Sequence, residues 1–251
     1  MNRRTVPTAL HPFTDGRPPH LPCGPGDVCA DVLVPGDPDR VALLATMLDS
    51  VTDFGRRREF AVVSGRYNGH PLSICSSGIG GPSTEIALVE LAMLGARRVI
   101  RIGGMSALVD DIPTGSYVVA DKAIGMSGVA PLYSTAAADE LSSDPGLCAA
   151  LLDTARAKGL VVRPGKVATS DSYYLGQDRP FAAADDLETS YLDSFRKRGA
   201  VGVDMESLLG VHGNRATDDW LVDYEPTQRN LLHIAGDALI RAQSETPKEK
   251  E

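Results

Sequence analysis

The feature that most constrains the fold is a regular alternation between short apolar runs and segments with helical spacing. Apolar runs such as 31–34 and 99–102 suit buried strands, while 40–48 and 83–94 repeat apolar residues at the helical period. Ser83, two residues before Glu85, predicts the start of the second helix. The alternation continues from residue 28 to residue 243 without a repeat or a linker. It predicts a single α/β domain with a mixed central sheet flanked by helices.

The two ends of the chain do not share this alternation. Residues 1–27 are rich in proline and show no apolar period, so we expect an extended Pro-rich N-terminal arm. Residues 244–251 form a charged tail. The expected organisation is therefore an arm over 1–27, an α/β domain over 28–243 and a tail over 244–251.

The composition excludes several classes of function. The 33 acidic residues outnumber the 25 basic ones, which gives a net charge of −8 and argues against a nucleic-acid partner. No apolar run is long enough for a membrane span or a signal peptide, so we expect no membrane partner. The four scattered cysteines suit a reduced, cytoplasmic protein, and the five histidines contain no pair at metal-ligand spacing.

Polar residues with possible chemistry follow the predicted strands. Gly36 and Arg40 flank the start of a helix, where a backbone amide and a guanidinium can hold a phosphate, although a Pro-Gly turn with a surface arginine has the same pattern. Arg101 lies inside an apolar strand and must be paired or bind a ligand. The basic run 56–58 is typical of a solvated turn. It comes before a predicted β-hairpin, whose tight turn is indicated by Asn68-Gly69. The glycines of 77–84 match neither a dinucleotide fingerprint nor a P-loop.

Five segments taken together carry a family resemblance. In order they are 34–40, 75–84, 101–103, 176–179 and 204–207. Their conjunction resembles the nucleoside phosphorylase family of the hexameric type, and within it the uridine phosphorylases. The similarity extends over 28–207 and weakly to 242. It implies reversible attack of inorganic phosphate on C1′ of a nucleoside, which releases the free base and a pentose 1-phosphate with no cofactor.

The resemblance also implies roles for individual residues. Phosphate is expected to contact Gly36, Arg40 and Arg101, with the amide of Gly104 beside them. Arg58 is expected to reach the phosphate site of a neighbouring subunit, which implies a homo-oligomer with active sites shared across a dimer, up to a hexamer.

The remaining roles concern the sugar, the base and a cation. The ribose is expected to contact Met205 and Glu206, with His20 at the 5′-hydroxyl unless it is an ordinary surface histidine. The base is expected to contact Tyr173, Gln177, Arg179 and Arg215. The residues expected to carry catalysis are Arg101, Glu206 and Arg179, and those that match an interfacial monovalent-cation site are Glu59, Ile79 and Ser83.

Two departures from the family pattern bear on activity. Gly104 stands where the family has a threonine whose hydroxyl touches phosphate and sugar. The segment 207–215 is short by roughly fifteen residues, about a helix remnant plus a strand. Either the sheet loses a strand beside the site, or a neighbouring segment fills the gap. Arg215 still matches the arginine of the family, but its register on the strand that would present it is left open.

Three functions remain open on this basis. The leading hypothesis is phosphorolysis of a pyrimidine nucleoside similar to uridine by a pentosyltransferase. The second is a weakened or inactive homologue that binds nucleoside or phosphate and assembles as an oligomer. The third is a purine nucleoside phosphorylase or nucleosidase. Such enzymes carry an aspartate near 214–215, whereas Gln177 with Arg179 favours uracil.

Overall fold

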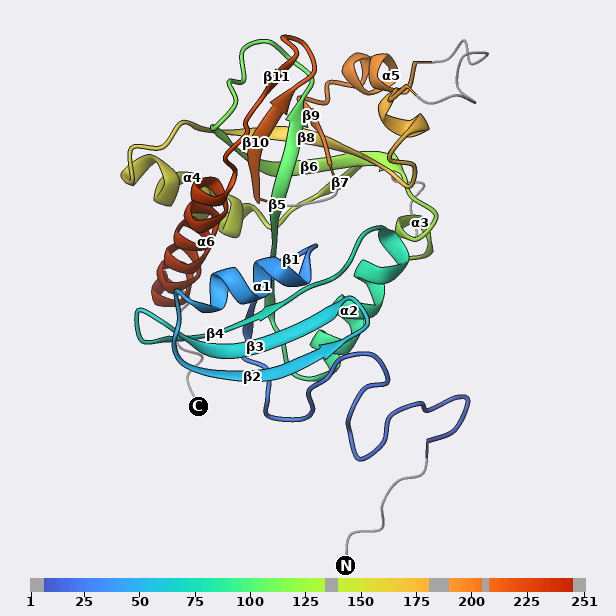
Figure 1. The fold of residues 1–251 in the computed structure, drawn as a ribbon, viewed down its shortest axis with the longest axis vertical. Helices are drawn as coiled ribbons and strands as arrows, with labels where there is room; N and C mark the ends of the chain where they lie inside the picture. Colours follow the sequence, from blue (N-terminus) through green and yellow to red (C-terminus); the bar gives the residue numbers. More distant parts are fainter. Residues whose placement is uncertain (1–6, 134–139, 181–189, 205–207, 246–251) are drawn as a thin grey trace, which may run out of the picture. The chain divides into compact units, whose positions relative to one another are not determined.

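The computed structural model describes residues 7–133, 140–180, 190–204 and 208–245 (Figure 1). Contacts within the chain define two compact units, 1–101 and 102–251. Strand β5 (Arg98–Ala107) runs through the boundary between them. Each unit contributes paired strands and helices, and the predicted α/β class with a mixed sheet is confirmed.

The first unit is built around a parallel pair and a hairpin. β1 pairs in parallel with β4, β3 lies antiparallel to β4, and β2 pairs antiparallel with β3. Asn68 and Gly69 both have positive φ, as the predicted tight turn between β3 and β4 requires. The strands of this unit are β1 (Asp31–Pro35), β2 (Asp49–Arg57), β3 (Phe60–Tyr67) and β4 (His70–Cys75).

Two helices of the first unit begin in different ways. In α1 (Pro38–Ala45) the carboxylate of Asp37 caps the N-terminus by accepting a hydrogen bond from the Asp39 amide, 2.9 Å away. In α2 (Gly81–Met93) the N-cap is Gly80, so the predicted start at Ser83 is wrong. The Ser83 hydroxyl lies 2.7 Å from Glu59 Oε1 and 2.6 Å from the Ser77 carbonyl oxygen, and it is therefore engaged outside the helix.

The Pro-rich arm contributes to the core of the first unit. Its described part, from residue 7 onward, contains no helix and consists of turns, bends and an isolated bridge between Thr14 and Arg17. Leu21 and Cys23 are nevertheless buried with Val32, Phe60 and other apolar residues of the strands. The end of the arm therefore contributes apolar burial, which is the main stabilising contribution to a core of this kind.

The second unit contains a closed ring of strands. β5 pairs with β10, β10 with β6, β6 with β8, β8 with β9, and β9 pairs back to β5. Closure removes the unpaired edges that an open sheet would expose. Side chains from these strands form an apolar cluster that includes Met105, Val118, Val167 and Leu209. The other strands of the ring are β6 (Tyr117–Met126), β8 (Val162–Ser170), β9 (Gly202–Val203) and β10 (Leu208–Asn214).

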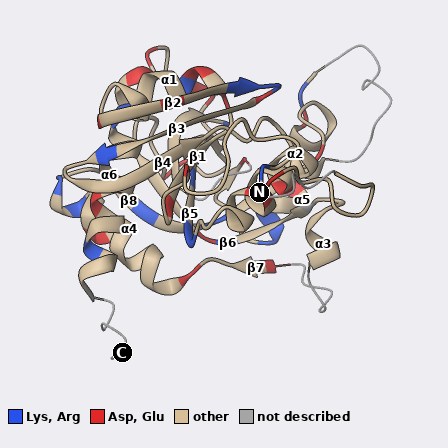
Figure 2. Ribbon diagram, turned by 90° about the horizontal axis from the view of Figure 1, so that it is seen from below, with Lys and Arg blue, Asp and Glu red and all other residues tan. Residues whose placement is uncertain are grey.

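The helices and short strands of the second unit surround this ring. Helices α4 and α6 pack side by side (Figure 1), and an ion pair of 2.6 Å joins Lys158, the C-cap of α4, to Asp237 of α6. Figure 2 shows acidic and basic residues interspersed along the ribbon, with the basic end of β2 among them. The remaining elements are α3 (Ala130–Tyr133), β7 (Glu140–Ser142), α4 (Pro145–Ala157), the 3₁₀ helix η1 (Leu175–Gln177), α5 (Tyr191–Lys197), β11 (Asp219–Trp220) and α6 (Glu225–Glu245).

The shortened segment 207–215 contains a strand, β10. The sequence left open whether the sheet loses a strand here, and β10 shows that it does not. Leu208 pairs with Ile102 of β5 and with Val119 of β6, so β10 fills the gap between these strands. The shortening therefore spares the strand.

Candidate functional site

The expected phosphate ligands Gly36 and Arg40 lie at the end of β1 and in the first turn of α1. The Gly36 carbonyl oxygen accepts a hydrogen bond from the Gly78 amide at 2.9 Å, and the Pro35 carbonyl oxygen accepts one from Ser77 at 3.0 Å. These bonds fix the turn after β1 against the turn after β4. The turn leads into the N-terminus of α1, where backbone amides favour an anion.

Arg101 occupies the interior of β5, as the sequence predicts. It is 8% exposed, between Ile100 and Ile102, which are almost fully buried. Burial of a guanidinium among apolar residues is costly unless it is hydrogen-bonded or paired with an anion. The role of Arg101 as a phosphate ligand stays a prediction.

Arg58 and His20 lie at different kinds of position. Arg58 is exposed in the turn between β2 and β3, with a φ of 55°. His20 is partly buried, and its Nδ1 lies 2.6 Å from Glu90 Oε1. When the neutral imidazole donates from Nδ1 to that carboxylate, its Nε2 is left as an acceptor, to which a hydroxyl group can donate. His20 is thus an anchored residue of the arm.

Two of the three residues of the expected cation site touch each other. The Ser83 hydroxyl at Glu59 Oε1 lowers the pKa of the Glu59 carboxyl below its usual value. Ile79 is 85% exposed on the adjoining turn. Among the described residues, no group of three or more histidine, cysteine, aspartate or glutamate side chains forms a metal cluster.

The expected ribose ligands Met205 and Glu206 lie outside the described residues. The structure does describe the strands on either side, β9 and β10. Both are members of the closed ring of strands. The roles of the two residues stay predictions.

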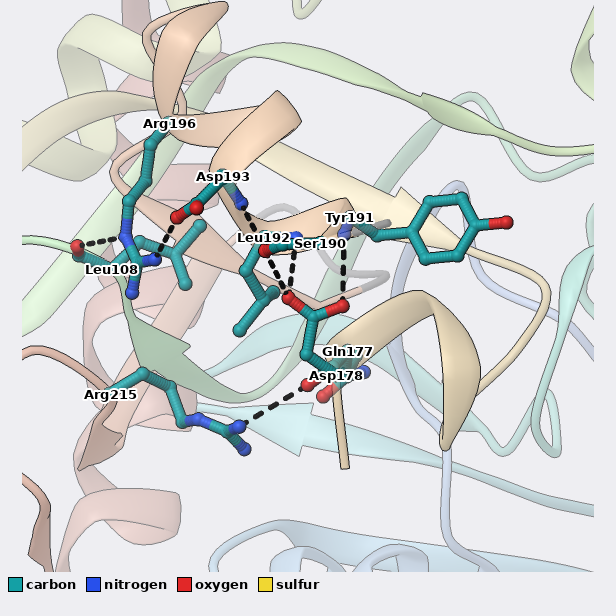
Figure 3. Close-up of polar contacts among 9 residues, drawn as sticks. All are labelled: Leu108, Gln177, Asp178, Ser190, Tyr191, Leu192, Asp193, Arg196 and Arg215. Carbon is teal, nitrogen blue, oxygen red and sulfur yellow. Dashed lines mark hydrogen bonds and ion pairs between the residues drawn. The ribbon is translucent and has the colours of Figure 1, made fainter. Parts of the chain in front are cut away.

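The residues expected to bind the base come together in the second unit. The Arg179 guanidinium lies 4.2 Å from the centre of the Tyr173 ring, and its Nη2 donates to Gln177 Oε1 at 3.2 Å. Arg215 Nη2 donates to the backbone carbonyl oxygen of Gln177 at 3.3 Å, as Figure 3 shows. Burial, together with the charge of Arg179, lowers the pKa of the Arg215 guanidinium. Two guanidinium groups, an amide and an aromatic ring thus form one polar group, which we call the base cluster.

Asp178 holds this cluster in place, and no role for it was predicted. Its backbone is in the left-handed region, with a φ of 47°, at the end of η1. Its carboxylate accepts hydrogen bonds from Ser190 Oγ at 2.6 Å, the Tyr191 amide at 2.9 Å and the Leu192 amide at 3.0 Å (Figure 3). The carboxylate therefore joins the turn that carries Gln177 and Arg179 to the N-terminus of α5. The signal in the sequence is the polar triplet 177–179 before a helix, but the partners are distant in the chain.

Asn214 holds Arg215 in a similar way. Asn214 is buried at the end of β10, and its Nδ2 donates to the carbonyl oxygens of Val109 at 2.9 Å and Ile112 at 2.8 Å. Its Oδ1 accepts from the amides of Ala216 at 2.8 Å and Thr217 at 3.3 Å. All the hydrogen-bonding capacity of the amide is used within the protein. The register of Arg215, which the sequence left open, is therefore set by its neighbour.

Gly104 lies in β5 opposite Gly210 of β10. The space that a side chain would occupy at this position is already filled by His212 and Tyr224. Glycine at position 104 therefore leaves room for these two rings.

The fold and the base cluster define the class of protein: an α/β protein whose second unit combines a closed ring of strands with a cluster of two guanidinium groups, an amide and an aromatic ring. Residues 31–212 match the phosphorylase superfamily, and the chain belongs to this family. The resemblance predicted from the five segments is confirmed.

Several curated relatives are similar to most of this chain. The uridine phosphorylase of Thermococcus kodakarensis is 35% identical over 220 residues, which covers 83% of this chain and 78% of the relative. The uridine phosphorylase of Escherichia coli is 36% identical over 182 residues, 70% of each chain. The guanosine phosphorylase of Halorubrum lacusprofundi is 30% identical over 189 residues, 75% of this chain and 73% of the relative. None of the described helices is both long and apolar enough to cross a bilayer.

Proposed function

We propose that the protein is a pentosyltransferase that cleaves a pyrimidine nucleoside similar to uridine with inorganic phosphate. A phosphate oxygen forms a bond to C1′ while the C1′–N1 bond breaks, and the electron pair passes to the base, which takes up a proton. The products are uracil and a pentose 1-phosphate. Inorganic phosphate is the co-substrate, and the reaction as written needs no cofactor.

The observation that carries this proposal is the base cluster. Uracil offers two carbonyl oxygens and one N–H along its edge. Gln177 can accept from the N–H and donate to a carbonyl oxygen, while Arg179 donates to the other. Negative charge develops on the base as its bond to C1′ breaks, so fixed donors at its oxygens stabilise the transition state. The uridine phosphorylases among the relatives support the same substrate class.

A specific observation weighs against the purine alternative. The purine enzymes were expected to carry an acid near 214–215, and this position is Asn214, which has no ionisable proton. Its amide is fully used in four hydrogen bonds to the backbone. The similarity to a guanosine phosphorylase is the observation that favours the purine alternative.

The decisive experiment measures release of uracil from uridine with and without phosphate. We expect phosphate-dependent release, with cytidine and guanosine cleaved more slowly, because the 4-amino group of cytosine offers a donor where Arg179 needs an acceptor. Release of guanine at the higher rate would favour the purine alternative. Binding of uridine or phosphate by calorimetry, without turnover of any nucleoside, would favour the weakened homologue.

We also propose that the active site is shared within a homo-oligomer in the cytoplasm. Arg58 is exposed in a turn, where it is free to serve a neighbouring subunit, and α2 exposes the apolar side chains of Leu88, Val89 and Met93. The four free cysteines are compatible with a reducing compartment. Mixing the inactive variants Arg58→Ala and Arg101→Ala tests the shared site, since mixed dimers regain one intact site. No recovery after exchange of subunits, verified by native mass spectrometry, would contradict it.

A further inference from the structure

A buried carboxylate in the first unit holds the end of the N-terminal arm. Glu90 lies within α2, and its side chain is only 6% exposed. Its Oε2 accepts hydrogen bonds from the backbone amides of His20 at 3.2 Å and Leu21 at 2.8 Å, and its Oε1 lies 2.6 Å from His20 Nδ1. These three contacts all come from the arm. Because a buried charge is costly without hydrogen bonds, the burial of Glu90 depends on the docked arm.

Arg57, the last residue of β2, attaches the same stretch of the arm to a second element. Its Nη1 donates to the carbonyl oxygen of Pro19 at 2.8 Å and to that of Pro18 at 3.5 Å. A proline has no backbone N–H, so its carbonyl oxygen is the polar group through which its backbone can be held. We call Arg57, Glu90 and the four consecutive residues that they hold, 18–21, the arm clamp.

The clamp divides the basic run 56–58 between two tasks. Arg56 Nε donates to the carbonyl oxygen of Arg58 at 2.6 Å, inside the turn where Arg58 has a φ of 55°. Arg57 instead reaches the arm, 38 positions earlier in the chain. A cluster of guanidinium groups attracts anions, but the Arg57 group is bound to backbone oxygens of the arm. The run is therefore not one uniform basic patch, and Arg57 belongs to the arm.

The clamp leaves His20 held at three points. Its backbone amide and its Nδ1 are bound to Glu90, and its ring packs edge-to-face on the Phe60 ring, with centroids 6.3 Å apart. Phe60 begins β3 and is almost fully buried, whereas the His20 side chain is 31% exposed. A partly exposed side chain that is already held in this way loses little conformational entropy when it binds a ligand.

We propose that Arg57 and Glu90 are positioning residues for the nucleoside, which act through His20. Arg57 holds the arm by two carbonyl oxygens, and Glu90 holds both the backbone and the ring of His20. Neither residue touches a substrate; each fixes the place from which the imidazole meets the sugar. The kinetic consequence rests on the proposed function and on the role expected for His20, while the clamp itself is measured without turnover.

Hydrogen exchange measured by mass spectrometry on the full chain tests the clamp. Glu90→Gln keeps the shape of the side chain but turns one of its two acceptor oxygens into a donor. Arg57→Ala removes the donor to the proline carbonyl oxygens. We expect both variants to exchange the amides of His20 and Leu21 about tenfold faster than wild type, because the docked arm opens more often. Exchange as slow as in wild type in both variants would overturn the inference.

Arg66 offers a matched control for Arg57. It is an exposed arginine on β3 whose Nη1 donates to the carbonyl oxygen of Gly69 at 2.7 Å, far from the arm in sequence. Arg66→Ala therefore removes the same kind of bond from the same unit. It should leave the exchange of the arm and the kinetics as in wild type. Faster exchange of the arm in Arg66→Ala, equal to that in Arg57→Ala, would show a general loosening of the unit and refute the clamp.

Steady-state kinetics test the positioning role. Arg57→Ala and Glu90→Gln should raise KM for uridine about fivefold, less than the roughly tenfold expected for His20→Ala, with KM for phosphate unchanged. Arg57→Lys keeps one donor for the Pro19 carbonyl oxygen and should stay within about twofold of wild type. In a His20→Ala background, Arg57→Ala should have no further effect on KM for uridine. An additive effect there, or a rise confined to KM for phosphate, would overturn the positioning role.

The two measurements separate this inference from the proposed function. Faster exchange of the arm in the variants of a protein that releases no uracil would support the clamp and refute phosphorolysis. Phosphate-dependent release of uracil, with KM for uridine unchanged in both Arg57→Ala and Glu90→Gln, would support phosphorolysis and refute the positioning role.

Discussion

Replacing Asp178 tests whether the base cluster depends on the N-terminus of α5. The Asp178 carboxylate accepts three hydrogen bonds, from Ser190 Oγ and from the amides of Tyr191 and Leu192. Asp178→Ala removes both acceptor oxygens, and with them all three bonds, and leaves two amides of the first turn of α5 to solvent. It also places alanine at a φ of 47°, where aspartate is better tolerated.

The expected loss of stability follows from these two effects. A lost helix cap costs about 1 kcal/mol, and alanine in the left-handed region about 1 kcal/mol more, so the free energy of unfolding should fall by about 2 kcal/mol. For a chain of this size each kcal/mol shifts Tm by about 2–4 °C, which gives a fall of about 4–8 °C. Asp178→Asn keeps one acceptor oxygen and the tolerance of positive φ, so its effect should be about half as large.

Circular dichroism melts and steady-state kinetics measure the two consequences separately. We expect KM for the nucleoside to rise in Asp178→Ala, because the turn that carries Gln177 and Arg179 loses its attachment, while KM for phosphate stays unchanged. Ser190→Ala, which removes one of the three bonds and also the N-cap bond that Ser190 Oγ accepts from the Asp193 amide, serves as the comparison for a loss of the α5 cap alone. A Tm within 1 °C of wild type, or equal changes in both KM values, would refute the reasoning.

Other predictions concern the base cluster and the buried thiols. Asn214→Ala should lower the free energy of unfolding by about 3 kcal/mol in urea titrations, since it leaves two buried carbonyl oxygens without donors; an unchanged midpoint would contradict this. Arg179→Lys should raise KM for uridine about tenfold at unchanged Tm, because lysine loses the fork that both meets Gln177 and covers Tyr173; kinetics and a melt decide. Burial raises the pKa of the Cys23 thiol from 9.0 to about 11, so only the unfolded chain ionises between these values. The contribution of Cys23 to stability should therefore be constant below pH 8 and fall by about 1.4 kcal/mol per unit between pH 9 and 11, and Cys23→Ala should make the slope of stability against pH shallower by that amount.

Elements with strong local signals were predictable from sequence. The β3–β4 hairpin follows from Asn68-Gly69 between two alternating strands, and β1 from a buried apolar run before Pro-Gly. β2 was missed because it is exposed along nearly all its length and its pairing with β3 is interrupted by irregularities. Such a strand carries no period-2 pattern, and its existence depends on the neighbour that it pairs with.

The residues of the candidate site also differ in whether a local sequence signal predicts them. Gln177 and Arg179 are close in sequence, so one short motif suffices to find them. The roles of Asp178 and Asn214 depend on partners such as Tyr191 and Val109, which lie 13 or more residues away. These residues come into contact only when the chain folds, so no spacing rule in the sequence predicts their hydrogen bonds. Likewise, the sequence shows only that Gly104 lacks the threonine hydroxyl of the family. The structure shows in addition that His212 and Tyr224 fill the space that a side chain at this position would occupy.

The closed ring of strands explains why β10 is retained within the short segment 207–215. β10 is the member of the ring that joins β5 to β6, and without it both strands would present unpaired edges. The strand also ends at Asn214, whose amide oxygen accepts hydrogen bonds from the backbone after Arg215 and so positions this residue. The same strand therefore completes the ring and places a residue that is proposed to contact the base. A chain that lost β10 would lose the ring and this part of the site together.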